Sequence, residues 1–278
     1  DYQGRLKETT QTGAELIGDG SVEADAEMIA MVIESLLAVG LEEFQVSVGH
    51  VGFFKSLLKE SHLDEEMELE LREYISNKNI FGVRELLEPL PVAAALKESF
   101  AELPNLFGSA EVLERAERCA VTEDAKRATE RLRRIWDLVS CYGFEKYLTF
   151  DLGAVSKYKY YTGIIFQAYT YGTGEPVAKG GRYDTLMDHF GKPAPATGFA
   201  FVVDRLMSAL SRQKIEIDTH IPRALIIYRA SQAEKAIAKA RELRREGVAA
   251  ELVQERIGRD YASYAEKNGI QDIIFIEG

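Results

Sequence analysis

The chain has 278 residues, of which 46% are hydrophobic and 28% are charged. This composition is that of a globular protein and excludes a disordered, collagen-like or disulfide-stabilised chain. The length allows two domains and leaves room for a third small one. With 34 basic and 45 acidic residues the net charge is −11, whereas a nucleic-acid-binding protein usually shows a basic footprint. No apolar run approaches the roughly 18 residues that span a bilayer, so we expect no membrane association.

The start of the chain and its cysteines bear on where the protein acts. The segment from Asp1 to Arg5 contains neither an initiator Met nor an apolar signal region, and we expect the chain to be part of a longer one. Cys119 and Cys141 lack metal-ligand spacing and are expected to be reduced thiols. No zinc-binding spacing is formed by the histidines His50, His62, His189 and His220. We therefore predict a cytoplasmic protein without a metal or a cofactor.

The first part of the chain alternates strand and helix patterns. Residues 3–17 read as a polar strand. A helix is predicted over 22–38, because Ser21 can cap it and acidic residues occupy its first turn. Alternating apolar residues over 44–48 predict a half-buried strand. From 51 to 147 the pattern is helical, and because strands are predicted on both sides we interpret 51–147 as a helical insertion.

The last helix of this insertion, over 123–143, carries the densest basic cluster of the chain. Its members are Lys126, Arg127, Arg131, Arg133 and Arg134. Basic residues at helical spacing are typical of a solvated helix face, and we predict such a face here. No basic surface for tRNA is therefore expected on the insertion.

The second half of the chain predicts two further domain segments. Strands are expected over residues 148–153, 160–171, 176–181 and 196–203, followed by a helix that ends at Leu210. Residues 211–222 are polar and read as a linker. Beyond them strand and helix patterns alternate, which indicates a small α/β domain. The predicted domains are a core of 1–50 and 148–212 whose N-terminal part is missing, the insertion 51–147, and a small domain 221–278, either complete or truncated.

The first candidate site segment is Gln11-Thr12-Gly13-Ala14-Glu15. In a strand, Gln11, Gly13 and Glu15 face the same side. A Gln and a Glu that flank a position without a side chain form a polar floor, and such a floor suits an ammonium group. The alternative is an exposed strand face without a ligand.

Two further segments combine aromatic residues with glycines. If Tyr160 and Tyr161 lie in a strand, they point to opposite faces, and one can present its hydroxyl to a pocket. The alternative is a pair of ordinary sheet tyrosines. Gly180 and Gly181 in the next strand suggest close approach by a ligand or another backbone, or else a tight strand exit. Arg182, which follows them, is placed to pair with Asp184 or with a substrate.

The last candidate segment runs from Ala196 to Arg205. Arg205 lies near the start of a predicted helix whose approach strand contains Gly198. That placement suits a planar cation beside a nucleotide. The alternative is a surface salt bridge of Arg205 with Asp204 or Asp188.

Taken in order, the segments QxGxE, YYTG, GGRYD and ATGFAxxxDR resemble the histidyl-tRNA synthetase family. The resemblance covers about residues 3–50 and 148–210. It implies an α+β fold of the class II aminoacyl-tRNA synthetase type. Such a fold has an antiparallel sheet with helices, a helical insertion, and a small C-terminal α/β domain similar to an anticodon-binding domain.

The family includes true synthetases and a non-catalytic relative, the regulatory subunit of ATP phosphoribosyltransferase. Synthetases carry an Arg that stabilises charge during adenylate formation, and Ser156 stands at that position here, while Lys159 replaces an Asp. Loss of such a preorganised cation costs roughly 100–1,000-fold in rate. The resemblance therefore favours the regulatory branch. The alternatives are an active histidyl-tRNA synthetase, which activates histidine with ATP and transfers it to tRNA, and a synthetase-like nucleic-acid sensor.

The regulatory branch implies a role for each candidate residue. Gln11 and Glu15 would contact the amino group of histidine, Tyr161 and Tyr183 would wall the pocket, and the floor would be Gly180 and Gly181. Arg205 would be a vestigial nucleotide contact, and no residue would be catalytic or bind a metal. The implied partners are a short-form ATP phosphoribosyltransferase catalytic subunit and histidine as effector, within a hetero-oligomer that contains a homodimer of this chain and no tRNA.

Overall fold

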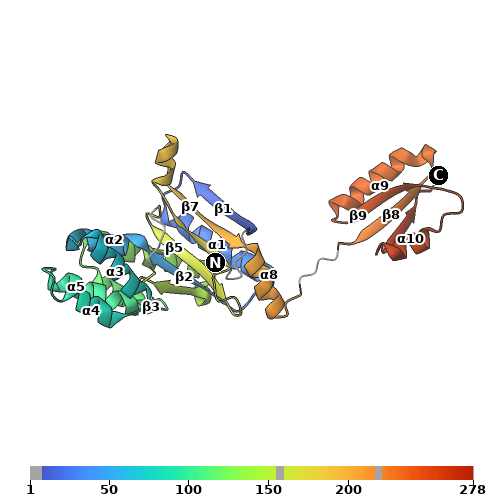
Figure 1. Ribbon diagram of the computed structural model, residues 1–278. Helices are drawn as coiled ribbons and strands as arrows, with labels where there is room; N and C mark the ends of the chain where they lie inside the picture. Colours follow the sequence, from blue (N-terminus) through green and yellow to red (C-terminus); the bar gives the residue numbers. More distant parts are fainter. Residues whose placement is uncertain (1–7, 155–159, 217–220, 278) are drawn as a thin grey trace. The chain divides into compact units, whose positions relative to one another are not determined.

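The computed structural model describes residues 8–154, 160–216 and 221–277, and the chain forms two compact units, residues 1–216 and 217–278. The larger unit is built on a seven-stranded sheet with the order β1-β7-β6-β5-β2-β4-β3 (Figure 1). Neighbouring strands are antiparallel except β2 and β4. The strands are β1 (Gln11–Ile17), β2 (Phe44–His50), β3 (Phe107–Gly108), β4 (Leu148–Asp151), β5 (Ile164–Thr170), β6 (Ala178–Arg182) and β7 (Ala196–Val202).

One face of this sheet is covered by α1 and α7, which also pack against each other (Figure 1). Buried residues of the two helices and of the strands form one continuous hydrophobic core, which includes Ile33, Val48, Leu132 and Phe166. The helices of the unit are α1 (Val22–Ala38), α2 (Val51–Ser61), α3 (Glu65–Ser76), α4 (Ile80–Leu87), α5 (Ala94–Glu102), α6 (Val112–Cys119), α7 (Glu123–Cys141) and α8 (Val203–Arg212). The predicted α+β architecture, in which helices pack on a mainly antiparallel sheet, is thereby confirmed.

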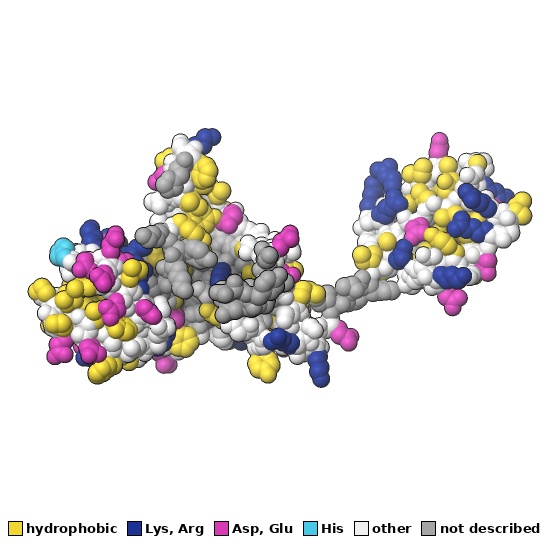
Figure 2. Space-filling model, viewed as in Figure 1, with side chains coloured by type: hydrophobic (Ala, Val, Ile, Leu, Met, Phe, Trp, Pro, Cys, Tyr) yellow, Lys and Arg dark blue, Asp and Glu magenta, His cyan; other side chains and the backbone are white. Residues whose placement is uncertain are grey.

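Residues 51–147 are helical, as predicted, apart from the short strand β3. This strand pairs with β4 and extends the sheet, which the sequence pattern did not reveal. Helices α2 to α7 contribute buried residues to the same core as the sheet. The division of the first 212 residues into a core and a separate insertion stays a prediction. In the view of Figure 2, acidic side chains gather over the helices of this stretch.

The start of α1 follows from its sequence. The Ser21 hydroxyl accepts a hydrogen bond from the backbone N–H of Ala24 at 3.2 Å, which is the cap that was predicted. Glu23 and Asp25 lie in the first turn, where the positive end of the helix favours negative charge. Glu23 faces solvent, whereas Asp25 is completely buried. A buried carboxylate requires a positively charged partner, and two arginines pair with Asp25.

His50 caps α2 and makes the stability of this unit depend on pH. Its Nδ1 accepts a hydrogen bond from the backbone N–H of Gly52 at 3.1 Å. Burial, reinforced by the positive charges of Arg131 and Arg182, lowers the pKa of His50 from 6.5 to about 4. Because the unfolded chain then binds more protons between pH 4 and 6.5, stability is expected to fall as pH drops through that window, by at most about 3 kcal/mol.

The variant His50→Asn isolates this contribution, because Asn caps a helix and does not titrate. Urea unfolding at several pH values, followed by the fluorescence of Trp136 (the single tryptophan of the chain), measures the effect. Wild type is expected to lose more stability than His50→Asn between pH 6.5 and 4. Parallel pH profiles for the two proteins would show that His50 does not titrate in this way.

The C-terminal unit is a small parallel sheet with a helix on each face. Its elements are β8 (Arg223–Tyr228), α9 (Ala233–Arg245), β9 (Ala249–Gln254), α10 (Tyr261–Lys267) and β10 (Asp272–Phe275), with strand order β10-β8-β9. Along β8, Leu225 and Ile227 pack with Tyr261 of α10, whereas Ile226 packs with Ala236 of α9. The strand β8 is therefore buried on both faces. A parallel strand in such a position requires consecutive apolar residues. The predicted small α/β fold is confirmed. In neither unit, within the described residues, is any helix both long and apolar enough to cross a membrane.

Candidate amino-acid-binding site

The sheet face opposite α1 and α7 carries a row of small residues beside one carboxylate. Strand register places Glu15 of β1 next to Gly198 of β7, which pairs with Gly181 of β6. The row continues to Ile165 of β5 and Gly49 of β2. Side chains alternate between the two faces of a strand, so these residues share one face. Gly198 and Gly181 are adjacent in this row, so the centre of this face carries no side chains of its own.

The glycines are required because other side chains lie over them. A Cβ atom on Gly181 would lie 2.6 Å from Cε1 of Tyr161, so the Tyr161 ring covers this position. A Cβ on Gly198 would collide with the Glu15 carboxylate and lie 2.6 Å from the carbonyl oxygen of Ala14. Glu15 and Tyr161 thus lie above neighbouring glycines of a common floor.

Tyr183 completes the polar part of the site. Its hydroxyl donates a hydrogen bond to Oε2 of Glu15. Burial, together with the hydrogen bond to Glu15 and its negative charge, raises the pKa of Tyr183, so the hydroxyl stays protonated as a donor at neutral pH. The Tyr160 ring lies 4.4 Å from that of Tyr161 and 6.0 Å from that of Tyr183, measured between ring centroids. A carboxylate bordered by three tyrosines is chemically suited to a small ligand with an ammonium group and a flat side chain.

The expectation that Tyr160 and Tyr161 lie in a strand and point to opposite faces is wrong. Strand β5 begins at Ile164, and the two rings lie side by side. The chain before β5 is fixed differently, because the backbone N–H groups of Thr162 and Gly163 both donate to the carbonyl oxygen of Arg182, at 2.9 and 3.4 Å. This arrangement brings both tyrosines to the site.

Not every predicted site residue meets at this position. Gly180 faces the core, where a Cβ would collide with the buried Phe166 ring, so packing explains this glycine. Gln11 shares the face of Glu15 but lies four residues away along β1, roughly 13 Å between Cα atoms. Arg205 pairs with Glu175 and donates to the carbonyl oxygen of Pro176 at 3.1 Å, not to Asp204 or Asp188.

Three positions on which the comparison with synthetases depends, Ser156, Lys157 and Lys159, lie outside the described residues. Farther along the same sheet face is a hollow of about 360 Å³, lined by β2, β4 and β5 side chains that include Ser47, Thr149 and Gln167. Among the residues that the structure describes, no cluster of His, Cys, Asp and Glu could hold a metal ion.

A buried ion-pair network beneath the site was not predicted. Arg182, whose side chain is 3% exposed, contacts Oδ1 of Asp25 at 2.8 Å, and Arg131 of α7 contacts Oδ2 at 2.6 Å. Arg182 also pairs with Asp184 at 3.0 Å and donates to the carbonyl oxygen of Asp19. The sequence indicated the pair of Arg182 and Asp184, but nothing in the pattern indicated Asp25. The network fixes the residues that follow Gly181 and therefore positions Tyr183.

The Gly198 position gives a direct test of the floor. Gly198→Ala is expected to displace the Glu15 carboxylate and to crowd the β1–β7 pairing, which costs about 1–3 kcal/mol of unfolding free energy. The matched control is Gly20→Ala, since a Cβ there would meet only Pro195, at 3.6 Å. Urea unfolding followed by Trp136 fluorescence compares the two. Equal stability of both variants would mean that Glu15 does not lie over Gly198.

The chain is similar to known proteins along almost its whole length. The family model for histidyl-tRNA synthetase matches residues 1–206. ATP phosphoribosyltransferase regulatory subunits from Acetivibrio thermocellus and a Thermoanaerobacter species are 40% and 39% identical. The matches cover 98% and 99% of this chain and 65% and 71% of the relatives. The chain thus spans about two thirds of the length of the curated relatives that it matches.

Solved structures give the same result. A structure from Bacillus halodurans, described as an ATP phosphoribosyltransferase regulatory subunit/histidyl-tRNA synthetase, matches with a TM-score of 0.71 and 34% identity, over 99% of this chain and 70% of that one. The histidyl-tRNA synthetase of Nostoc matches with a TM-score of 0.68 at 19% identity, over 94% of this chain and 65% of that one, and this likeness shows the fold alone. The chain therefore belongs to the histidyl-tRNA synthetase family and, within it, to the ATP phosphoribosyltransferase regulatory subunits.

Proposed function

We propose that this protein is a non-catalytic regulatory subunit of ATP phosphoribosyltransferase. It is required for the activity of a short-form catalytic subunit and takes part in histidine feedback on the first step of histidine biosynthesis. The names of the relatives support this role. Within the complex the chain forms a homodimer. It acts in the cytoplasm, and the free thiols of Cys119 and Cys141 agree with that compartment.

The observation that carries the proposal is the amino-acid site on the open sheet face. Glu15 supplies the negative charge for the ammonium group of histidine. The hydroxyl of Tyr183 holds Glu15 through a hydrogen bond. Tyr161 walls the pocket above Gly181, and the flat imidazole stacks against it.

A non-catalytic role is supported by Arg205. The side chain pairs with Glu175 and donates to Pro176, so its guanidinium is already occupied by the turn between β5 and β6. A nucleotide would have to displace both contacts. We infer that Arg205 is a vestigial nucleotide contact and that this chain requires no cofactor.

The second candidate is an active histidyl-tRNA synthetase, which the match of the family model favours. Two assays of the purified protein separate the candidates. The regulatory role predicts that phosphoribosyl-ATP formation by a short-form catalytic subunit depends on this protein. It also predicts no histidine-dependent exchange between ATP and pyrophosphate. Exchange without activation would establish the synthetase instead.

A further inference from the structure

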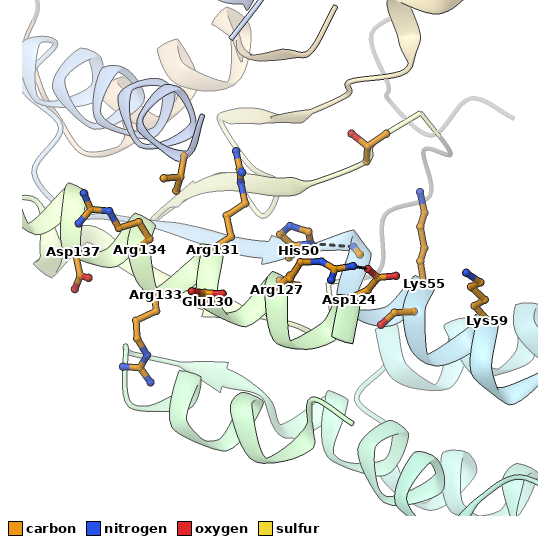
Figure 3. Close-up of a pocket in the computed structure, with 15 residues that line it drawn as sticks. His50, Lys55, Lys59, Asp124, Arg127, Glu130, Arg131, Arg133, Arg134 and Asp137 are labelled. Carbon is orange, nitrogen blue, oxygen red and sulfur yellow. Dashed lines mark hydrogen bonds and ion pairs between the residues drawn. The ribbon is translucent and has the colours of Figure 1, made fainter. Parts of the chain in front are cut away.

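A groove of about 850 Å³ lies along α7, on the side that faces α2 and the start of α1. Lys55 and Lys59 reach it from α2, and Arg127, Arg131 and Arg134 reach it from α7 (Figure 3). Glu130 of α7 also lines the groove and adds one negative charge to it. Arg133 and Asp137 border the groove as well, but in Figure 3 they point to the other side of α7. The sequence predicted only a solvated face for the α7 arginines. The fold adds two lysines and a concave shape.

The acidic partners of these cations leave much of their charge available. Arg127 pairs with Asp124, and Arg134 lies 3.6 Å from Glu23, but every one of these side chains is more than half exposed. Such pairs are weak and exchange readily with another anion. Lys59 forms no ion pair with any residue that the structure describes. Arg131 alone is firmly held, by the buried Asp25.

Two titratable groups that line the groove have lowered pKa values, chiefly because they are buried. Burial and the charge of Arg72 lower the pKa of Lys55. Burial and the charges of Arg131 and Arg182 lower the pKa of His50, which also lines the groove.

The spacing of the cations indicates more than one phosphate. Lys55 and Lys59 are one helical turn apart, roughly 6 Å. Arg127 and Arg134 are separated by seven residues of α7, roughly 10 Å. A single phosphate cannot contact all four at hydrogen-bond distance. The volume falls in the range of small-molecule sites. The net charge of −11 would repel a long polyanion that extends beyond the groove.

The groove is joined to the amino-acid site by a direct contact. Nζ of Lys55 donates to the carbonyl oxygen of Tyr161 at 2.7 Å. The ring of the same Tyr161 lies over Gly181 in the amino-acid site. An anion that draws the ammonium group of Lys55 into the groove would release this carbonyl. The position of the Tyr161 ring would then depend on whether the groove is occupied.

We propose that the groove between α2 and α7 binds a small molecule with two or more phosphate groups, and that Lys55 communicates this binding to Tyr161. The first part stands on the groove alone. The second part rests on the function proposed above, in which Tyr161 walls a histidine pocket. Because effector coupling is reciprocal, the phosphorylated ligand and histidine would change each other's affinity by the same factor.

Titration calorimetry of the full 278-residue chain with inorganic pyrophosphate tests the groove. Wild type is expected to bind pyrophosphate more tightly than orthophosphate. The Lys55→Gln/Lys59→Gln variant is expected to bind it about tenfold or more weakly. Arg127→Gln/Arg134→Gln, which leaves the contact between Lys55 and Tyr161 intact, is expected to weaken binding as well. The control Lys126→Gln changes an α7 lysine that pairs with Glu123 outside the groove, and it should bind as wild type does.

Equal pyrophosphate affinity in all these proteins would overturn the proposal. So would an RNA hairpin that displaces pyrophosphate at lower concentration and with steep salt dependence, because the groove would then be a nucleic-acid site. For the coupling, the dissociation constant of histidine is measured with and without saturating pyrophosphate. We expect a change of about fivefold or more that Lys55→Gln abolishes. An unchanged dissociation constant of histidine contradicts the coupling. Failure to bind histidine at all contradicts the proposed function. In that case the pyrophosphate titration still shows whether the groove binds phosphate groups.

Discussion

Replacing Asp25 by Asn is expected to lower the free energy of unfolding of the N-terminal unit by about 3–5 kcal/mol. Asp25 is fully buried and accepts ion pairs from Arg182 and Arg131. Removing its charge leaves two cations facing each other, one of them buried. Most domains are stable by only about 5–15 kcal/mol, so this loss would be a large fraction of the total. Urea unfolding at neutral pH, followed by Trp136 of α7, reports on this unit alone.

Two comparison variants show whether burial is the cause. Arg131 is 25% exposed, so Arg131→Gln should cost less than Asp25→Asn. Glu98→Gln breaks the exposed pair of Glu98 with Arg84 and should cost less than about 1 kcal/mol. If Asp25→Asn were no more destabilising than Glu98→Gln, the network would not hold β6, α1 and α7 together.

Glu15→Gln is expected to weaken histidine binding about 10- to 100-fold. The substitution keeps the size of the side chain and its contact with Tyr183 but removes the charge that the ammonium group requires. Hydrogen bonds to charged groups contribute about 1.5–3 kcal/mol, which sets this range. Titration calorimetry with histidine at neutral pH measures the change.

The matched control for this experiment is Glu34→Gln. Glu34 is an exposed acid on α1, which covers the other face of the sheet, so its replacement should leave histidine affinity unchanged. Loss of affinity in both variants would point to a general effect of net charge. Unchanged affinity in Glu15→Gln would place the amino group of histidine elsewhere.

Local patterns predicted the elements well where the periodicity was strong. The helix from Val22 to Ala38 has both ends at the predicted residues. Its N-cap and the periodicity of its apolar face indicate the same helix. Alternation around Phe44 found β2, although the strand runs on to His50. The two-residue strand β3 was missed, since Phe107 and Gly108 have no period of their own and pair only because β4 lies beside them.

The candidate site was predicted in part, and the failures have a common physical origin. Residue types indicated Glu15 and Gly181, and the family resemblance indicated Tyr161 and Tyr183. The role of Gly180 depends instead on which face of β6 it occupies. Strand β5 begins at Ile164, four residues later than predicted, so Tyr160 and Tyr161 precede the strand and both lie at the site. Asp25 looked like an ordinary acid in the first turn of a helix. Its burial between arginines from 106 and 157 residues away is a property of the tertiary fold.

The measurement to make first follows phosphoribosyl-ATP formation by a short-form catalytic subunit together with wild-type protein or with Glu15→Gln, over a range of histidine concentrations. We expect both proteins to activate the catalytic subunit. Histidine should reverse the activation by wild type, and the Glu15→Gln complex should require about 10- to 100-fold more histidine for the same effect. Absence of activation by either protein, or identical histidine inhibition of both complexes, would contradict a regulatory subunit that senses histidine at Glu15.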